Sequence, residues 1–487
     1  MIQHPVSFYR TLQQRWLNRE KRAIQTDDIT LSYADLDNRV GRAMGWLDAQ
    51  GLVRGDVLAV QIPRALCFLE LHLAALARGI TTLAINPRYT PAELAFYLSD
   101  SGAKLAILIE ETTDTNATVH LAHTIPQQLA ESPIGAEPQE LPDDTTAMLM
   151  YTSGTTGRPK GAVISHANLA GTVRALHEAW QWQPQDVLLH ALPLFHIHGL
   201  FVAQHGALYA NATTIWMAHF GAKQALETIE SQRCSVLMGV PTFYNRFLAL
   251  PATVSADLSS MRLFTSGSAP LPARVHEGFY SRFGHQILER YGMTEVGIVL
   301  SNPYGALRKP GTVGFPLPGV KIRIVDEQGQ DQPAGQPGEL WIQGPSVISG
   351  YRNLPEQTAE TITDGWLHSG DIAREDPDGY IQIVGRAKDM IITGGLNVYP
   401  VEIESALLKH PDVAEVAVVG VADDDWGEVV VAMVVPAPGA KPSPDMLRSF
   451  VRETLSHYKC PKSIRLADQL PRNAMGKVQK SVIRTDW

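Results

Sequence analysis

Short apolar runs alternate with longer segments of helical periodicity near the start of the chain. The segment 31–52, LSYADLDNRVGRAMGWLDAQGL, predicts an amphipathic helix that ends at Gly51, and 65–79 predicts a second helix. Three apolar runs between and after them predict short buried strands, at 56–62, 81–86 and 104–110. Strands that alternate with helices favour an α/β architecture with mostly parallel sheets.

The pattern changes twice further along the chain. The polar, proline-containing segment 111–144 predicts a surface connection. From Lys321, short alternating runs separated by turn residues predict a small antiparallel β-rich subdomain, at 321–326, 338–344 and 379–385. Beyond Arg386 the order is strand, helix, strand, then another strand, a helix and a basic tail. We therefore predict a large N-terminal α/β domain, 1–386, and a small C-terminal α+β domain, 388–487.

Composition narrows the class of protein. A chain of 487 residues is too long for one compact core, and 45% apolar with 19% charged residues is typical of a soluble enzyme. The net charge of -9 does not indicate the strongly basic surface that binding of nucleic acid requires. No signal peptide or apolar run of spanning length is present, so we expect no membrane span and place the protein in the cytoplasm. Three cysteines lack metal-ligand or redox-pair spacing and are expected to be buried, inert thiols: Cys67, Cys234 and Cys460.

The stretch YTSGTTGRPKG, residues 151–161, lies between two apolar runs and is rich in glycine and hydroxyl groups. Glycine lets the backbone approach an anion closely, and successive N–H groups can then bind phosphate. The spacing differs from a Walker A loop, because Lys160 follows Pro159 and precedes Gly161. Taken alone, the stretch is also compatible with a mobile turn. The side chains that add donors or charge are Thr152, Ser153, Thr155, Thr156 and Lys160.

Six further motifs follow in order: LPLFHIHGL (192–200), SGSAPL (266–271), ERYGMTE (289–295), GWLHSGD (365–371), GRAKDMIITGG (385–395) and PRNAMGKVQK (471–480). Together with the glycine-rich loop they resemble the adenylate-forming superfamily of acyl-CoA synthetases, firefly luciferases and peptide-synthetase adenylation domains. The resemblance covers essentially the whole chain. It implies that a carboxylic acid is activated by ATP with Mg²⁺ as an acyl-adenylate, and that the acyl group then passes to the thiol of coenzyme A.

The resemblance also implies roles for individual residues. Thr294 would contact the α-phosphate and Glu295 would bind Mg²⁺. Lys477 would be the central catalytic residue, touching the attacking carboxylate and the α-phosphate, and Lys388 would mark the hinge of a mobile C-terminal domain. Considered without the PRNAMGKVQK motif, Lys477 would be interpreted as part of a solvated basic tail. The other implied cofactor-binding residues are Thr152, Ser153, Gly154, Thr155, Thr156, Gly157 and Lys160 at the phosphates, Ser268, Ala269 and Tyr291 at the adenine, Gly292 and Met293 in the same motif as Tyr291, Asp371 and Arg386 at the ribose, and Gly394 and Gly395 at the pantetheine arm.

The acyl side of the site is implied in the same way. His196 fits the family's gating position beside the acyl pocket, where it is counted among the catalytic residues, and His198 and Ser266 are assigned to substrate binding. Arg290 lies just before YGMTE, at the pocket floor by family analogy. Arg246 lies on a helix predicted to begin at Pro241, near the edge of an apolar stripe. The stripe is formed by Phe243, Phe247 and Leu250.

The two arginines bear on the choice of acid. An unpaired guanidinium in an apolar fatty-acid pocket would be costly, whereas a dicarboxylic acid would supply its partner. Several motifs resemble malonyl-CoA and methylmalonyl-CoA synthetases in particular, which implies that Arg246 and Arg290 hold the free carboxylate. Val296 departs from the threonine of many bacterial members and would tolerate a bulkier acyl group.

Other interpretations stay open from the sequence. If Arg290 forms a structural ion pair with Glu289 or another acid and Arg246 extends to solvent, the acid would be a medium-chain, branched or aryl monocarboxylate. The acceptor could be a carrier-protein thiol, and the chain could bind adenylate without turnover, although intact Lys477, Glu295 and Lys160 argue against that. Both a monomer and a homodimer are compatible with the sequence.

Overall fold

The computed structural model describes residues 7–62, 66–112, 114–152, 159–394, 396–423, 425–472 and 478–487. These residues form two compact units. The large unit contains residues up to 271, 275–321 and 342–367, and the small unit contains 272–274, 322–341 and 368–487. The predicted fold class, a large region of layered α/β sheets with a smaller C-terminal part, is confirmed. The predicted boundary near Lys388 stays a prediction.

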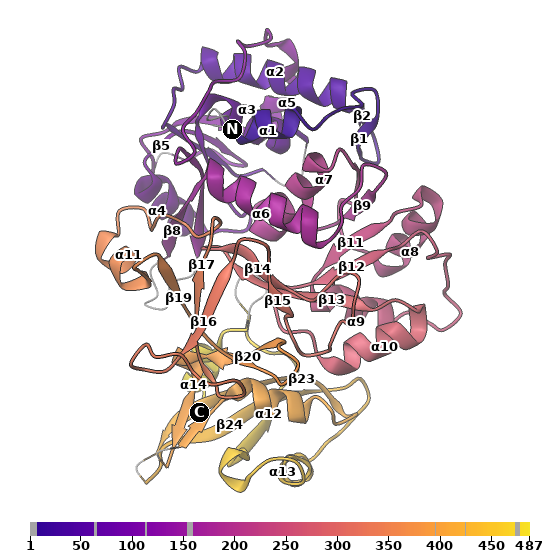
Figure 1. The fold of residues 1–487 in the computed structure, drawn as a ribbon, viewed down its shortest axis with the longest axis vertical. Helices are drawn as coiled ribbons and strands as arrows, with labels where there is room; N and C mark the ends of the chain where they lie inside the picture. The colour runs from indigo at the N-terminus through magenta and orange to yellow at the C-terminus, as the bar shows by residue number, and fades with distance from the viewer. Residues whose placement is uncertain are drawn as a thin grey trace. The chain divides into compact units, whose positions relative to one another are not determined.

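A six-stranded sheet in the large unit carries the glycine-rich loop. Its order is β6-β5-β3-β4-β7-β8, parallel except for the antiparallel pair β7–β8. Helices α2, α3 and α5 pack against one another beside it (Figure 1). The strands are β3 Val57–Val60, β4 Thr81–Ala84, β5 Ala103–Leu108, β6 Thr118–Leu121, β7 Thr146–Thr152 and β8 Lys160–Ser165, and the helices are α2 Tyr33–Ala49, α3 Leu66–Arg78, α4 Pro91–Ser101 and α5 Ile125–Glu131.

The sequence signals explain the ends of these elements. Ser32 caps α2 through a capping box with Asp35, and Gly51 just beyond the helix has φ of 70°. The prediction of a surface connection over 111–144 was wrong in part, because β6 extends the sheet beside β5 and α5 packs on α2. Both elements are short and only partly apolar, so hydrophobic periodicity gave no signal for them.

A nine-stranded sheet forms the rest of the large unit, in the order β15-β14-β13-β12-β11-β9-β10-β1-β2. Pro241 opens α9 as predicted, and Phe243 and Phe247 on that helix are buried. The strands are β1 Arg22–Gln25, β2 Thr30–Ser32, β9 Val187–His190, β10 Thr213–Trp216, β11 Val236–Gly239, β12 Leu263–Ser266, β13 Ile287–Met293, β14 Gly297–Ser301 and β15 Phe315–Pro316. The helices are α1 Phe8–Gln13, α6 His166–Ala179, the π-helix η2 His198–Gln204, α7 His205–Tyr209, α8 Ala222–Gln232, α9 Pro241–Leu248 and α10 Ala273–Phe283.

Two further sheets follow, and the first contains the strands predicted at 321–326, 338–344 and 379–385. The first has the order β16-β17-β19-β18 with β20 on β19, and the second has the order β22-β21-β24-β23 with β25 on β24. Their strands are β16 Lys321–Val325, β17 Gly338–Gln343, β18 Ile362–Thr363, β19 Trp366–Glu375, β20 Ile381–Arg386, β21 Ile391–Thr393, β22 Leu396–Val398, β23 Val413–Asp423, β24 Gly427–Pro436 and β25 Ser463–Leu466. The helices are α11 Pro355–Thr361, α12 Pro400–Leu407, α13 Pro444–Arg452 and α14 Lys480–Thr485.

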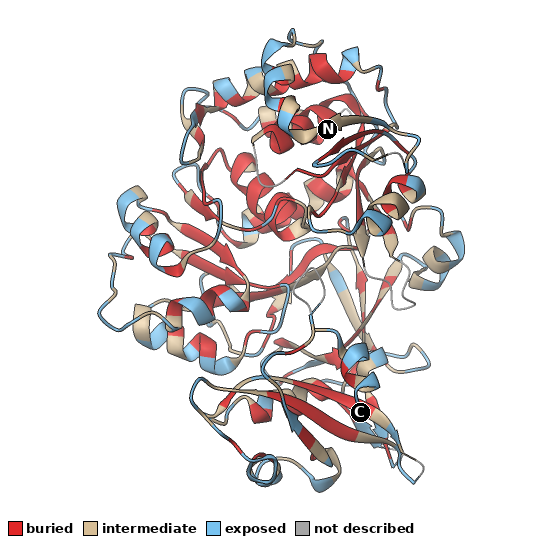
Figure 2. Ribbon diagram, turned by 180° about the vertical axis from the view of Figure 1, so that it is seen from behind, coloured by how far each residue is buried: buried red, intermediate tan, exposed pale blue. Residues whose placement is uncertain are grey.

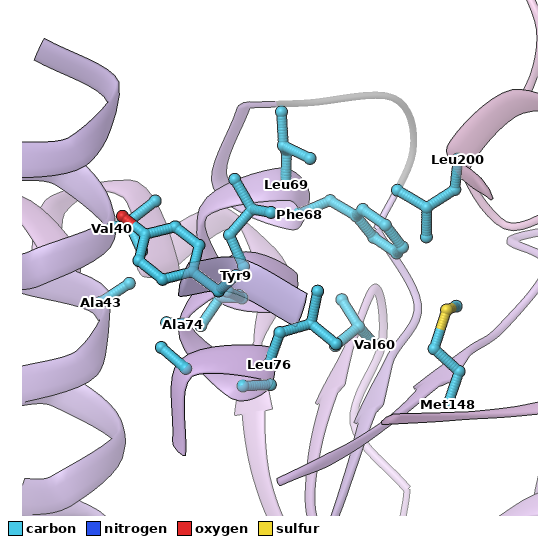
Figure 3. Packing of buried hydrophobic residues seen from close by; sticks show 14 of the residues in the cluster. Tyr9, Val40, Ala43, Val60, Phe68, Leu69, Ala74, Leu76, Met148 and Leu200 are labelled. Atoms are coloured by element: carbon cyan, nitrogen blue, oxygen red, sulfur yellow. The ribbon is translucent and has the colours of Figure 1, made fainter. Parts of the chain in front are cut away.

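Burial follows the layers, with the central strands buried and the surface helices exposed on one face only (Figure 2). In the main core of the large unit, Phe68 of α3, Met148 of β7 and Leu200 of η2 belong to one apolar cluster (Figure 3). Cys67, Cys234 and Cys460 are buried free thiols, as predicted. No described helix combines the length and apolar content needed to cross a lipid bilayer.

Candidate active site

Glu295 is the centre of a small polar cluster in the large unit. β7 ends at Thr152 and β8 begins at Lys160, and these two residues face each other across the antiparallel pair. The Thr152 hydroxyl donates to Glu295 Oε1 at 3.4 Å, and the Glu295 carboxylate is buried. The hairpin therefore brings the two ends of the glycine-rich loop beside the predicted magnesium ligand.

Tyr351 completes this cluster, and sequence reasoning missed it. Its hydroxyl donates to Glu295 Oε1 at 3.1 Å, and the Lys160 ammonium lies 5.1 Å from the centre of its ring. Burial, and then the nearby Glu295 carboxylate, raise the pKa of Tyr351, so the hydroxyl stays protonated and can donate. The partner is 56 residues away in sequence, so no local motif could have identified it.

The cluster fits a magnesium ion bound together with a phosphate. Magnesium favours one or two carboxylates with phosphate oxygens over a cage made only of protein ligands. In the described part of the chain no group of three or more His, Cys, Asp or Glu side chains could hold a metal ion. A single buried carboxylate beside the glycine-rich loop is the donor set that this chemistry requires. The predicted loop residues Ser153, Gly154, Thr155, Thr156 and Gly157, like Gly395 and Lys477, lie outside the described residues.

Arg290 lies on β13 next to the end of β12, and its side chain is 4% exposed. Two of its nitrogens, Nε and Nη2, have no hydrogen-bond partner among the residues that the structure describes. Burial lowers the pKa of Arg290 to about 9, which still leaves it cationic at neutral pH. Glu289 is no partner for it: neighbours on a strand point to opposite faces, and Glu289 Oε1 accepts from the Leu271 backbone N–H at 3.1 Å.

His198 and Ser268 lie beside this arginine. Ser268 Oγ is 3.2 Å from His198 Nδ1, and Ser268 has φ of 68°, the left-handed region that is uncommon for a residue with a side chain. His198 Nε2 is buried and has no hydrogen-bond partner within the described ranges. Burial, and then the charge of Arg290, lower the pKa of His198 well below its usual value, so the ring is neutral at pH 7. Ser266 Oγ is also buried without a described partner.

The remaining predicted residues of the large unit are more exposed. Arg246 lies in the last turn of α9, where it is exposed and its Nη1 donates to the Phe220 carbonyl at 3.5 Å. His196 is half-buried, with its ring 4.7 Å from that of Phe195. Ala269 is exposed, and four residues of the ERYGMTE motif are half-buried: Tyr291, Gly292, Met293 and Thr294.

In the small unit, Asp371 of β19 and Arg386 of β20 are paired across the strands. Arg386 Nε lies 2.7 Å from Asp371 Oδ1, and the Asp371 carboxylate is buried. Gly394 has φ of 57° and donates its N–H to the Trp426 carbonyl at 2.9 Å. The ribose-binding role of Asp371 and Arg386 and the pantetheine-binding role of Gly394 stay predictions.

Comparison with known proteins decides the family. Residues 13–352 match the family model for AMP-binding enzymes, and residues 402–477 match the model for the C-terminal domain of AMP-binding enzymes. The chain belongs to the AMP-binding enzyme family.

Relatives and solved structures refine what this AMP-binding enzyme does. It is 38% identical over 468 residues to a feruloyl-CoA synthase from an Amycolatopsis species, covering 95% of both chains. It is 36% identical over 444 residues to a mitochondrial malonate–CoA ligase from Mus musculus, covering 81% of this chain and 75% of the relative. The crystal structure of ATP-bound MatB from Rhodopseudomonas palustris superposes with a TM-score of 0.94 at 39% identity, covering 99% of both chains. This AMP-binding enzyme is an AMP-forming acid–CoA ligase that uses ATP and coenzyme A.

Proposed function

We propose that this AMP-binding enzyme activates malonate or methylmalonate as an acyl-adenylate, releasing pyrophosphate, and then transfers the acyl group to coenzyme A, releasing AMP. Arg290 carries the proposal. Its unpartnered atoms, Nε and Nη2, form one edge of the guanidinium, and two parallel N–H groups on such an edge bind a carboxylate bidentately. A buried cation without a partner is costly, and the second carboxylate of a dicarboxylic acid would supply that partner.

Neighbouring groups support a polar end to the acyl pocket. The neutral His198 ring and the Ser266 hydroxyl each keep a buried polar atom without a described partner. A carboxylate can accept hydrogen bonds from a hydroxyl and from a ring N–H as well as from Arg290. A wholly apolar acyl chain would leave all three groups unsatisfied.

The phosphate side of the reaction would use the cluster around Glu295. Glu295 would hold Mg²⁺, which when bound supplies positive charge to the phosphates of ATP. Thr152 and Tyr351 donate to the carboxylate and orient it. Lys160 would add a further positive charge at the end of the glycine-rich loop, and Lys477 keeps its predicted role at the attacking carboxylate and α-phosphate.

A monocarboxylic acid is the alternative substrate class. The feruloyl-CoA synthase, at 38% identity over 95% of this chain, is as similar as the malonate–CoA ligase at 36%. In that case Arg290 would have a structural role and the acid would be medium-chain, branched or aryl. The two candidates differ in whether a second carboxylate is needed for turnover.

CoA-dependent release of AMP separates them when malonate, methylmalonate, acetate, butyrate, octanoate and ferulate are compared. We expect selective turnover of malonate or methylmalonate. Arg290→Met should lower kcat/KM for that acid about 100-fold and leave the KM for ATP within about threefold, because it removes a charged bidentate contact. Arg246→Met, made separately, tests whether the exposed arginine contributes. A preference for butyrate, octanoate or ferulate would reject the proposal and leave the ligase chemistry unchanged.

A further inference from the structure

Gly267 packs directly against the Arg290 guanidinium. A Cβ atom at position 267 would lie 2.3 Å from Arg290 Cζ and 2.5 Å from both Nε and Nη1. Carbon and nitrogen atoms that are not bonded do not approach so closely, so no other residue at 267 leaves the guanidinium where it is. Gly267 directly follows β12 and donates its N–H to the Gly239 carbonyl at 3.3 Å, which anchors its backbone.

The guanidinium, and not the backbone, would have to move. Gly267 is the residue that joins β12 to Ser268, so its backbone is held at both sides, whereas the Arg290 guanidinium is the end of a flexible side chain. Gly267 does not have a positive φ, so its own backbone is compatible with alanine. An added methyl group would therefore displace the charged group rather than unfold the strand.

The displacement would disturb the Nε–Nη2 edge of Arg290, which we propose binds the second carboxylate of the substrate. The clash includes Nε, which is one of the two unpartnered nitrogens of that edge. His198 is close enough for the Arg290 charge to lower its pKa, so a moved guanidinium would also change the surroundings of that ring. The space left by the missing side chain of Gly267 thus affects both the position of the Arg290 guanidinium and the surroundings of His198.

We propose that Gly267 is a specificity-determining residue, because its missing side chain leaves the space in which Arg290 presents its Nε–Nη2 edge to the second carboxylate of the acid. This inference rests on the proposed function. It assigns Gly267 a positioning role through Arg290, without direct contact to the acid.

Gly267→Ala tests the inference, with Gly278→Ala as the matched control. A Cβ atom at Gly278, on α10, would meet only the Leu248 side chain, at 3.3 and 3.6 Å. We expect Gly267→Ala to lower kcat/KM for malonate about 30-fold and that for butyrate less than about threefold, because a lost charged contact affects only the acid that makes it. Gly278→Ala should change neither by more than about threefold. A malonate-to-butyrate ratio unchanged by Gly267→Ala would overturn the inference and leave the proposed function standing.

A double-mutant cycle with Arg290→Met keeps the test decisive for any substrate. If Gly267 acts through Arg290, Gly267→Ala should have almost no further effect on activity in the Arg290→Met background. If the wild-type enzyme prefers a monocarboxylate, the proposed function and the specificity role of Gly267 both fail, and the same cycle measured on the melting temperature then tests whether Gly267 positions Arg290. We expect Gly267→Ala to lower Tm in the presence of Arg290 and not in its absence. Equal losses in both backgrounds would show that Gly267 acts independently of Arg290.

Discussion

At the scale of single residues, Glu295 depends on its two hydroxyl donors. Tyr351→Phe keeps the ring beneath Lys160 and removes only the hydrogen bond of 3.1 Å to the carboxylate. We expect the Mg²⁺ concentration for half-maximal ATP–pyrophosphate exchange to rise about tenfold, since groups that orient a metal ligand typically contribute this much. At saturating Mg²⁺ the rate should change less than about threefold.

The control for this prediction is Tyr280→Phe, which alters an exposed tyrosine on α10 and should leave the Mg²⁺ dependence unchanged. A fall in the maximal rate with an unchanged Mg²⁺ dependence would mean that Tyr351 acts elsewhere than on Glu295.

The sequence pointed to Glu295, Arg290 and His198 because each lies in a recognisable motif. Tyr351 and Gly267 were missed for a physical reason. Tyr351 matters only through a contact across 56 residues, and Gly267 only through the space that it leaves for Arg290. Neither property is visible in local composition or spacing. Ser268 was named for its motif, but its φ of 68° could not be read from a serine.

At the scale of elements, Asn168 connects α6 to the segment that carries Tyr351. Its Oδ1 accepts from the Ser165 N–H at 2.9 Å, and its Nδ2 donates to the carbonyls of Pro345 and Val347, both at 2.9 Å. Asn168→Ala should lower the free energy of unfolding by about 2–3 kcal/mol, because buried partners lose their hydrogen bonds. Urea unfolding measures this loss. Asn245→Ala, at an exposed position of α9, should change the free energy of unfolding by less than about 0.5 kcal/mol. An equal loss in both variants would mean that the buried hydrogen bonds of Asn168 are not the cause.

Most elements could be predicted from periodicity and end signals, since long amphipathic helices and buried strands carry strong patterns. The segment 111–144 shows the limit. β6 has no fully buried residue and α5 is only seven residues long, so their positions depend on the neighbours β5 and α2. Tertiary packing decides such short elements.

At the scale of the whole molecule, three buried histidines make the large unit sensitive to acid. His72 Nε2 lies 3.0 Å from His205 Nε2, and His166 Nδ1 accepts the Phe8 N–H at 3.0 Å. Burial lowers the pKa of His166 to about 4 and that of His205 to about 3, and it lowers the pKa of His72 as well. The unfolded chain therefore takes up protons first as pH falls below about 6.5.

We expect the free energy of unfolding to fall as the pH is lowered from 6.5 to about 4. At pH 5 the loss is about 2 kcal/mol for each of His166 and His205. Glu289 opposes this in part, because burial raises its pKa to about 7 and its protonation favours the folded state. Comparing the Tm of the wild type and of His205→Gln from pH 7.5 to 5 removes that common contribution. The variant should lose less stability than the wild type over this range; parallel curves would mean that His205 is not the titrating group.

The two half-reactions of the whole enzyme should respond differently to Lys477→Ala. The predicted role at the attacking carboxylate implies loss of adenylation by at least about 100-fold, with transfer from preformed acyl-adenylate to coenzyme A largely retained. ATP–pyrophosphate exchange and single-turnover thioester formation measure the two steps separately. Equal losses in both would contradict this role for Lys477.

The close approach of Gly267 to Arg290 also restricts the order in which such a site can be acquired or engineered. In a relative with a larger residue at position 267, arginine at position 290 would meet a filled space and bring no selective advantage until glycine appeared first. When glycine appears first, a later arginine at position 290 can bring dicarboxylate specificity at once, whereas arginine first brings none until glycine follows. Libraries that vary one position at a time from such a parent would miss the dicarboxylate specificity, and paired libraries of positions 267 and 290 would recover it.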